Sequence, residues 1–248
     1  MSAMDITTLA AVGIVTAAGL VRGTTGFGGA MLMTPVLSAL LGPIPAVVTA
    51  LLMETAAALV MFPDALPKAR WRTLLYLILP AAVTVPLGGY FLLTVDPAVA
   101  RKMISAVVIV FSLMLLLGFR YSGSPRVITS LALGSVVGAL LGATSVGAPP
   151  VILYLMSGPD PVAVTRANLT LFVTAISVIG LIMLAAAGAI GGSLATSAML
   201  LVVPFLLATW LGGQLFARLS DAGARRFALV LMLCLGTASI FYRRTWWH

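Results

Sequence analysis

The chain alternates between long apolar runs and short polar connections from one end to the other. The 248 residues hold ten such runs, or one for about every 25 residues. A helix needs about 20 apolar residues to cross the roughly 30 Å hydrocarbon core of a bilayer. The pattern therefore predicts an all-α, polytopic protein embedded in a lipid bilayer. The ten predicted transmembrane segments are 6–21, 27–42, 44–62, 74–94, 103–118, 127–142, 146–157, 162–188, 194–217 and 227–242.

The second and seventh segments differ from the others because they are short and contain proline. Pro35 lies within the second segment, and Pro149 and Pro150 lie within the seventh. Each is either a broken helix that still crosses the membrane or a re-entrant hairpin that returns to the same side.

The basic residues favour ten crossings with the N-terminus outside. If all ten segments cross, ten of the fourteen Lys and Arg residues lie inside, as the positive-inside rule expects. If the second and seventh segments only dip into the membrane, seven basic residues lie on each side. The inside residues would be Arg22, Lys68, Arg70, Arg72, Arg120, Arg126, Arg166, Arg218, Arg225 and Arg226. The outside residues would be Arg101, Lys102, Arg243 and Arg244.

The composition agrees with a membrane location and argues against nucleic-acid binding and against a metal or cofactor site. The chain is 61% hydrophobic and 8% charged, whereas a soluble domain carries about 25% charged residues. Its net charge of +8 comes from basic residues that stand singly or in pairs between apolar runs, which is typical of topology signals and not of a nucleic-acid surface. One cysteine, Cys234, and one histidine, His248, leave little material for a metal site or a cofactor, and we expect neither.

The sequence also repeats itself. Residues 42–49 match residues 158–165 at five of eight positions, with an offset of 116. Further along, the order of proline, Gly-Gly and a basic pair recurs with identical spacing at an offset of 124. The pattern predicts two membrane repeats, 1–124 and 125–248, that together form one transport domain. Because each repeat holds five segments, an odd number, the second repeat should be inverted relative to the first.

Inverted repeats with short, Gly- and Pro-interrupted segments at matching positions are typical of secondary transporters. Two half-helices that meet near the membrane centre direct free backbone N–H groups and positive dipole ends toward one spot, which suits an anion. Glycines also serve close helix packing in lipid. We assign that packing role to Gly134, Gly138 and Gly142, spaced four apart, and a functional loop to the cluster at 26–29.

The loop motifs resemble those of a known family. The stretch Gly23-Thr24-Thr25-Gly26-Phe27-Gly28-Gly29, followed by Pro35, resembles the first glycine-rich signature of the TauE/SafE family of sulfite and organosulfonate exporters. Arg70-Trp71-Arg72 stands where that family often has a tryptophan-containing linker. Residues 145–155 and then Arg166-Ala167-Asn168 resemble the second-half signature. Two departures are the single Phe within the first glycine run and the loss of most glycines from the second copy.

The resemblance implies a multi-pass exporter in the cell (inner) membrane that carries sulfite, an organosulfonate or a related organic acid. Alternating access at a site between the two repeats follows from the predicted architecture. The residues expected to bind the substrate are Arg22, Thr24, Thr25, Gly26, Gly28, Gly29, Thr144, Ser145, Gly147, Arg166 and Asn168. For Arg22 and Arg166, snorkelling to the membrane interface is an equal alternative.

Glu54 is the acidic residue deepest within a predicted segment. An ionised carboxylate there costs several kcal/mol, so it should be protonated, paired or facing a wet cavity. We expect it to couple transport to protons or to belong to the substrate site, with a purely structural role as the alternative. An anion channel, an intramembrane enzyme and a partner subunit without transport activity are the rival functions; we expect no enzyme, because catalytic side chains are scarce. The oligomeric state stays open, a homodimer included.

Overall fold

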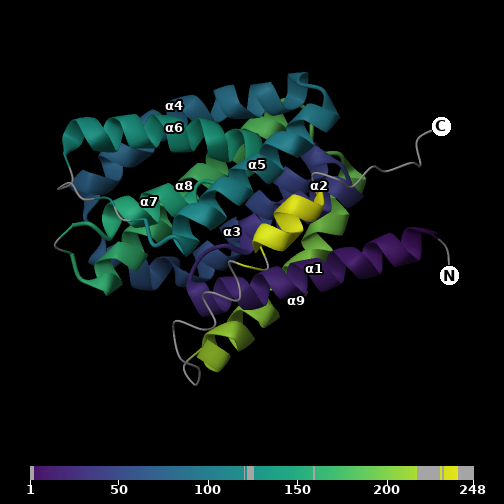
Figure 1. The fold of residues 1–248 in the computed structure, drawn as a ribbon, viewed down its shortest axis with the longest axis horizontal. Coiled ribbons are helices and arrows are strands. Elements are labelled where there is room, and N and C mark those ends of the chain that lie inside the picture. Colours follow the sequence, from purple (N-terminus) through teal and green to yellow (C-terminus); the bar gives the residue numbers. More distant parts are fainter. Residues whose placement is uncertain are drawn as a thin grey trace.

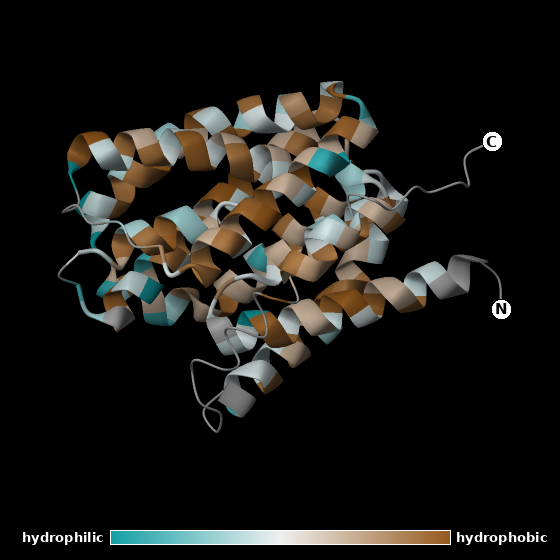
Figure 2. Ribbon diagram, viewed as in Figure 1, coloured by the Kyte–Doolittle hydropathy of each residue, from teal (hydrophilic) through white to brown (hydrophobic). Residues whose placement is uncertain are grey.

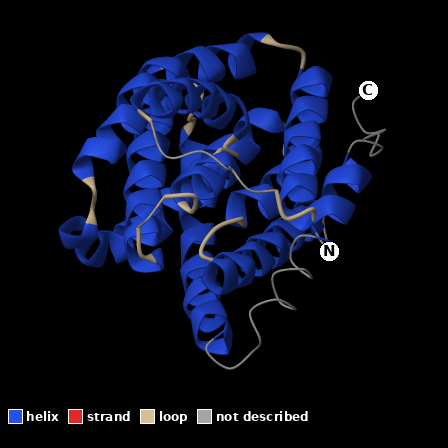
Figure 3. Ribbon diagram, turned by 60° about the vertical axis from the view of Figure 1, so that its left-hand side comes forward, coloured by secondary structure: helices blue, strands red, loops and turns tan. Residues whose placement is uncertain are grey.

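The described part of the chain is helical with short connections (Figure 1 and Figure 3). This computed structural model describes residues 3–119, 121, 126–158, 160–216, 230 and 232–239, and no strand occurs among them. The elements are α1 (Ala3–Thr25), α2 (Gly29–Leu40), α3 (Pro43–Ala65), the 3₁₀ helix η1 (Leu66–Lys68), α4 (Trp71–Thr94), α5 (Pro97–Leu116), α6 (Val127–Thr144), α7 (Ala148–Leu155), α8 (Val162–Ala186) and α9 (Gly192–Phe216). Residues 232–239 are also helical and fall within the tenth predicted segment.

The outer surface of the bundle is apolar. Seven helices of the described residues are long and apolar enough to cross a membrane, namely α1, α3, α4, α5, α6, α8 and α9. On α4, Val83 is 70% exposed and Leu87 is 63% exposed. Figure 2 shows hydrophobic residues along the outer helices, with hydrophilic ones mainly at helix ends and connections. Such a surface matches lipid and not water, so the protein is a multi-pass membrane protein.

The centre of the bundle is formed by α3 and α8, which are the most buried of the seven candidate spans. They run antiparallel. Leu51, in the first half of α3, packs against Gly180 late in α8. At the opposite end, the backbone N–H of Arg70, just after η1, donates a 2.9 Å hydrogen bond to Asn168 Oδ1 near the start of α8.

Glycines let α4 and α6 pack closely side by side. A Cβ on Gly134 would overlap the Leu77 carbonyl, and one on Gly138 would lie 2.6 Å from Ala81 Cα. A Cβ on Gly142 would overlap the Val85 carbonyl. Since the contacts advance in the same direction on both helices, α4 and α6 are parallel. The packing role predicted for these three glycines is confirmed.

A second parallel pair joins α1 to α9 in the same way. Gly19 of α1 lies against Phe205 and Ala208 of α9. Gly23, one turn further along α1, lies against Thr209 and Gly213. Both pairs join the two halves of the chain: α6 of the second half packs on α4 of the first, and α9 of the second half packs on α1 of the first.

Neither α2 nor α7 runs the length of the bundle. They have 12 and 8 residues and so span about 18 Å and about 12 Å, well short of the roughly 30 Å hydrocarbon core. α2 begins beside Glu54, the twelfth of the 23 residues of α3, and ends next to the start of α3. α7 folds back along α6. Tyr154, near the end of α7, donates from its hydroxyl to the carbonyl of Arg126, just before α6, at 3.2 Å. The expectation that the second and seventh segments are short or broken is confirmed by these lengths, whereas ten crossings stay a prediction.

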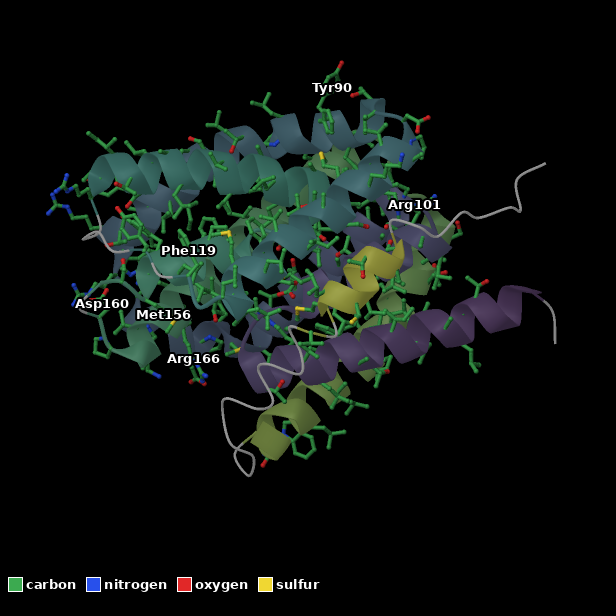
Figure 4. All side chains as sticks on the ribbon, viewed as in Figure 1. Tyr90, Arg101, Phe119, Met156, Asp160 and Arg166 are labelled. Atoms are coloured by element: carbon green, nitrogen blue, oxygen red, sulfur yellow. The ribbon has the colours of Figure 1, made fainter. Side chains whose placement is uncertain are left out.

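The helices nevertheless alternate in direction as ten crossings would require. α1 and α2 form a hairpin that enters and leaves at one end of the bundle, and α6 and α7 form another at the opposite end. We call these the Arg101 end, where Gly42, Pro43 and Arg101 line a common cavity, and the Arg166 end, where Arg70 pairs with Asp160 (Figure 4). Arg22 belongs to neither end and lies inside the bundle, 4% exposed.

Candidate functional site

A small central cavity lies where the first part of the chain meets the second. Its volume is about 20 Å³. α1, α2, α3 and the loop before α2 line it with Arg22, Gly28, Ala30 and Glu54. The end of α6, the start of α7 and the middle of α8 line it with Ser145, Gly147, Val173 and Ser177. A void of this size holds about one water molecule. The two glycine-containing loops that the sequence singled out are thus brought together at one point.

The main charges of the central cavity are Arg22 and Glu54. Arg22 Nη1 lies 3.1 Å from Glu54 Oε2, and the two side chains are 4% and 6% exposed. The same Nη1 donates to the Gly26 carbonyl at 3.0 Å, and Glu54 Oε2 has no hydrogen-bond partner despite its closeness to Arg22. An unpaired charge at this depth would cost several kcal/mol. Glu54 was expected to be protonated, paired or facing a wet cavity, and the structure shows it paired with Arg22.

The start of α2 points at the same carboxylate. The Ala30 N–H donates to Glu54 Oε1 at 3.1 Å. The first bond inside the helix runs from Leu32 N–H to the Gly28 carbonyl, so the N–H groups before Leu32 have no partner within α2. These free donors and the positive end of the helix dipole favour a negative charge. Glu54 supplies that charge from within the protein.

Two adjacent glycines make this turn possible for different reasons. Gly28 has φ 90°, a left-handed conformation that other residues rarely adopt. Gly29 lacks that strain but has no room, because a Cβ there would lie 3.1 Å from Glu54 Oε1 and 3.3 Å from Arg22 Cβ. A side chain at Gly28 would instead run into Met232. Gly29 is therefore the position where a substitution would press on the ion pair.

The second half contributes fewer donors than the first. Ser145 has φ 59° and ends α6, and its hydroxyl lies 2.8 Å from that of Thr34 on α2. α7 begins with Ala148, Pro149 and Pro150, and proline has no N–H. The expectation that both half-helices direct several amides at one spot is met for α2, whereas two of the first three residues of α7 are prolines and have no N–H to donate. Ser177 Oγ is buried beside the cavity and has no hydrogen-bond partner.

A larger vestibule adjoins the central cavity on the side of the Arg166 end. It has a volume of about 430 Å³ and lies between α1, α3, α8 and α9. Arg166 is exposed and lines it, together with Thr170, Trp210 and Gln214. Arg22 lines both the vestibule and the central cavity. A solute in the vestibule would therefore meet Arg166 and then Arg22 before the central cavity.

The structure places the predicted site residues in different surroundings. Arg22, Gly28, Ser145, Gly147 and Glu54 line the central cavity, Gly29 packs against Arg22 and Glu54, and Thr24, Gly26 and Arg166 line the vestibule. Thr144 is buried behind the cavity, where its hydroxyl donates to the Leu140 carbonyl. Asn168 lines neither cavity and accepts a hydrogen bond from Arg70. The side chain of Thr25 lies outside the described part of the chain.

Several lining residues were missed by sequence reasoning. Ser177 is the clearest, and Thr170, Thr174 and Ser177 follow one another at spacings of four and three along α8. This spacing puts hydroxyls on one helix face, which is a signal that could have identified it. Trp210 and Gln214 on α9 carry no such signal. In the described residues, no three His, Cys, Asp or Glu side chains come together as metal ligands would.

Comparison with known proteins gives one match. The family model described as "Sulfite exporter TauE/SafE" matches residues 9–239, nearly the whole chain. No curated protein and no solved structure matches.

Proposed function

Because this chain belongs to the sulfite exporter TauE/SafE family, we propose that it is a secondary transporter that exports a small anion. Sulfite, an organosulfonate or a related organic acid is the substrate class. The proposal rests on one observation above the others, namely that a buried arginine and the free N–H groups of α2 converge on a cavity between the two halves of the chain.

The anion route runs from the vestibule to the central cavity. Arg166 is the first cation on this route and, being exposed, attracts the anion from water. Arg22 is the second, and at 4% exposure its attraction is screened far less by water and salt. Neutral N–H and hydroxyl donors around Arg22 hold the anion in place without adding a second fixed charge. This permits release in each transport cycle.

We further propose that residues 1–124 and 125–248 form two inverted repeats. The helix pairing supports this, because exchanging the halves turns α1 packed on α9 into α6 packed on α4. The same exchange maps antiparallel α3 and α8 onto each other. The half-length helices α2 and α7 then occupy equivalent positions on opposite sides of the central cavity. Rocking of one repeat against the other would open the cavity alternately to each end of the bundle.

The proposed location is the cell (inner) membrane, with the Arg166 end inside and the N-terminus outside. Among the described residues, Lys68, Arg70, Arg72, Arg126 and Arg166 lie at or near the Arg166 end, against Arg101 and Lys102 at the other, which follows the positive-inside rule. In this orientation the vestibule faces the cytoplasm, as an exporter requires.

Carrier and channel are the two forms that this function can take. A channel needs a continuous water-filled path, whereas the central cavity narrows to about the size of one water molecule. This favours a carrier that opens to one side at a time. An intramembrane enzyme would need a cluster of catalytic side chains, and Arg22 and Glu54 are the only ionisable ones that line the central cavity in the described residues.

Counterflow in proteoliposomes tests the proposal. Vesicles that contain purified protein and a high internal concentration of unlabelled sulfite are diluted into a trace of labelled sulfite. A carrier exchanges the two and accumulates label transiently above equilibrium, and an alkyl sulfonate inside the vesicles should support the same exchange. Label that only equilibrates indicates a channel. Label that enters no faster than in empty vesicles rejects the proposal.

A further inference from the structure

We propose that the Glu54 carboxylate is a built-in competitor for the transported anion, so that the anion binds only together with one proton. This inference rests on the proposed function and concerns the same central cavity. It assigns to Glu54 a defined step: its ionised form occupies the site, and its protonated form releases it.

The contacts of Glu54 are those that a bound anion would make. Its Oε1 accepts the Ala30 N–H at 3.1 Å, at the positive end of α2. Its Oε2 lies 3.1 Å from Arg22 Nη1. The first is a donor at the start of α2, and the second is the only cation that lines the cavity in the described residues. An anion that arrives through the vestibule therefore finds its binding groups already occupied by a carboxylate.

Space prevents the anion from binding beside Glu54. The central cavity has room for about one water molecule, whereas a sulfite ion has four heavy atoms. Gly29 limits movement further, because α2 is already in contact with both Glu54 and Arg22 at this residue. The anion must take the place of the carboxylate.

Charge makes the exchange depend on a proton. From the elements packed around Glu54, α1 provides Arg22, whereas α2, α6, α7 and α8 line the cavity with uncharged residues. Arg166 of α8 lines the vestibule, where α9 provides no charge, and the described charges of α4 and α5 lie near the ends of those helices. Two negative charges would thus share one buried cation, which is strongly unfavourable at low dielectric constant.

Protonation removes the conflict. One proton from solution adds to a Glu54 oxygen and gives a neutral carboxyl group, and the anion then takes over Arg22 and the Ala30 N–H. Ser177 Oγ, which is buried at the same cavity without a partner, is available to the carboxyl group or to the anion. No bond other than O–H is formed. Each monovalent anion is then bound with one proton, and the transported load is neutral.

The test is the number of protons taken up when an anion binds to the purified, detergent-solubilised protein. Methanesulfonate is the main probe because its charge does not change with pH, and sulfite and acetate are used alongside it. Calorimetric titrations in buffers of different ionisation enthalpy give the proton count. We expect one proton taken up per anion at a pH where Glu54 is ionised. Over that range, the affinity should fall about tenfold for each pH unit increase.

Glu54→Gln mimics the protonated form and is expected to bind the anion without proton uptake and with an affinity that does not vary with pH. Asp96→Asn is the matched control, because Asp96 is exposed and caps α5 away from the cavity, and it should behave as the unmodified protein does. If Glu54→Gln does not fold, the proton count of the unmodified protein still decides. Anion binding without proton uptake overturns this inference and leaves the proposed function standing. Failure of all three anions to bind to the unmodified protein and to Glu54→Gln overturns both.

Discussion

Arg70 Nη2 lies 2.6 Å from Asp160 Oδ1, and this ion pair joins the connection before α4 to the connection before α8. The Arg70 side chain is 56% exposed and the Asp160 side chain is 13% exposed, so water screens the pair from the side of Arg70. The backbone N–H of the same residue donates to Asn168 Oδ1, and Asn168 is 1% exposed. Arg70 thus makes one partly exposed and one buried contact with residues 160–168.

We predict that the buried contact matters more for stability. Asn168→Ala removes the acceptor of the Arg70 N–H and should lower the free energy of unfolding by about 1–3 kcal/mol. Arg70→Gln removes the partly exposed ion pair but keeps the backbone N–H, and it should cost less than about 1 kcal/mol. Thermal unfolding in detergent, followed by tryptophan fluorescence, measures both. Equal losses in the two variants would contradict this account of Asn168, as would a loss of anion binding in a well-folded Asn168→Ala protein.

Gly29→Ala should weaken anion binding. The new Cβ would lie 3.1 Å from Glu54 Oε1 and 3.3 Å from Arg22 Cβ, so it would press on Arg22 and reduce the space into which the anion must fit. We expect an affinity loss of tenfold or more, which corresponds to about 1.4 kcal/mol. Gly192→Ala is the matched control, because Gly192 is also the first residue of a helix and nothing lies within 4 Å of its Cβ position. Binding titrations that show normal affinity in Gly29→Ala would move the site away from this turn.

Gly138→Ala should destabilise the protein without touching the site. Its Cβ would lie 2.6 Å from Ala81 Cα, so α4 and α6 would have to separate at a cost of about 1–3 kcal/mol. Gly13→Ala is the matched control, because nothing lies within 4 Å of its Cβ position, and it should be neutral or stabilising by up to about 1 kcal/mol. Melting temperatures of the two variants check the prediction. A Gly138→Ala protein as stable as Gly13→Ala would refute the close packing of the two helices.

Arg166→Lys should weaken transport mildly, because an exposed lysine keeps the charge and loses the planar pairing of a guanidinium with a sulfonate. We expect KM to rise about two- to tenfold, with part of the transport activity retained. The difference from the unmodified protein should shrink at high salt, since Arg166 is exposed. Initial flux rates at low and high ionic strength provide the measurement. A complete loss of transport would show that Arg166 holds the anion directly.

The sequence was sufficient to predict the helices but not how deep each one reaches. The apolar runs identified α1 to α9, because an apolar run of this length has one stable form in lipid. The charges favoured one orientation of the long helices. They do not report how far α2 and α7 reach into the membrane, because neither of these helices carries a charged residue.

For the site, local chemistry was predictable and long-range pairing was not. The turn before α2 was recognisable from Gly26, Gly28 and Gly29, since clustered glycines indicate a tight loop. The pairing of Arg22 with Glu54 joins residues 32 positions apart and depends on how α1 meets α3. The hydrogen bond between Arg70 and Asn168 could not be predicted for the same reason, because the two residues are 98 positions apart.

The flux of labelled sulfite through proteoliposomes that contain Arg22→Gln tests the central claim most directly. Arg22→Gln removes the buried cation, and Arg72→Gln removes an exposed one at the start of α4 as the control. At matched amounts of folded, reconstituted protein, the account predicts saturable flux for the unmodified protein and for Arg72→Gln, and flux at the level of empty vesicles for Arg22→Gln. Unchanged flux in Arg22→Gln would contradict it.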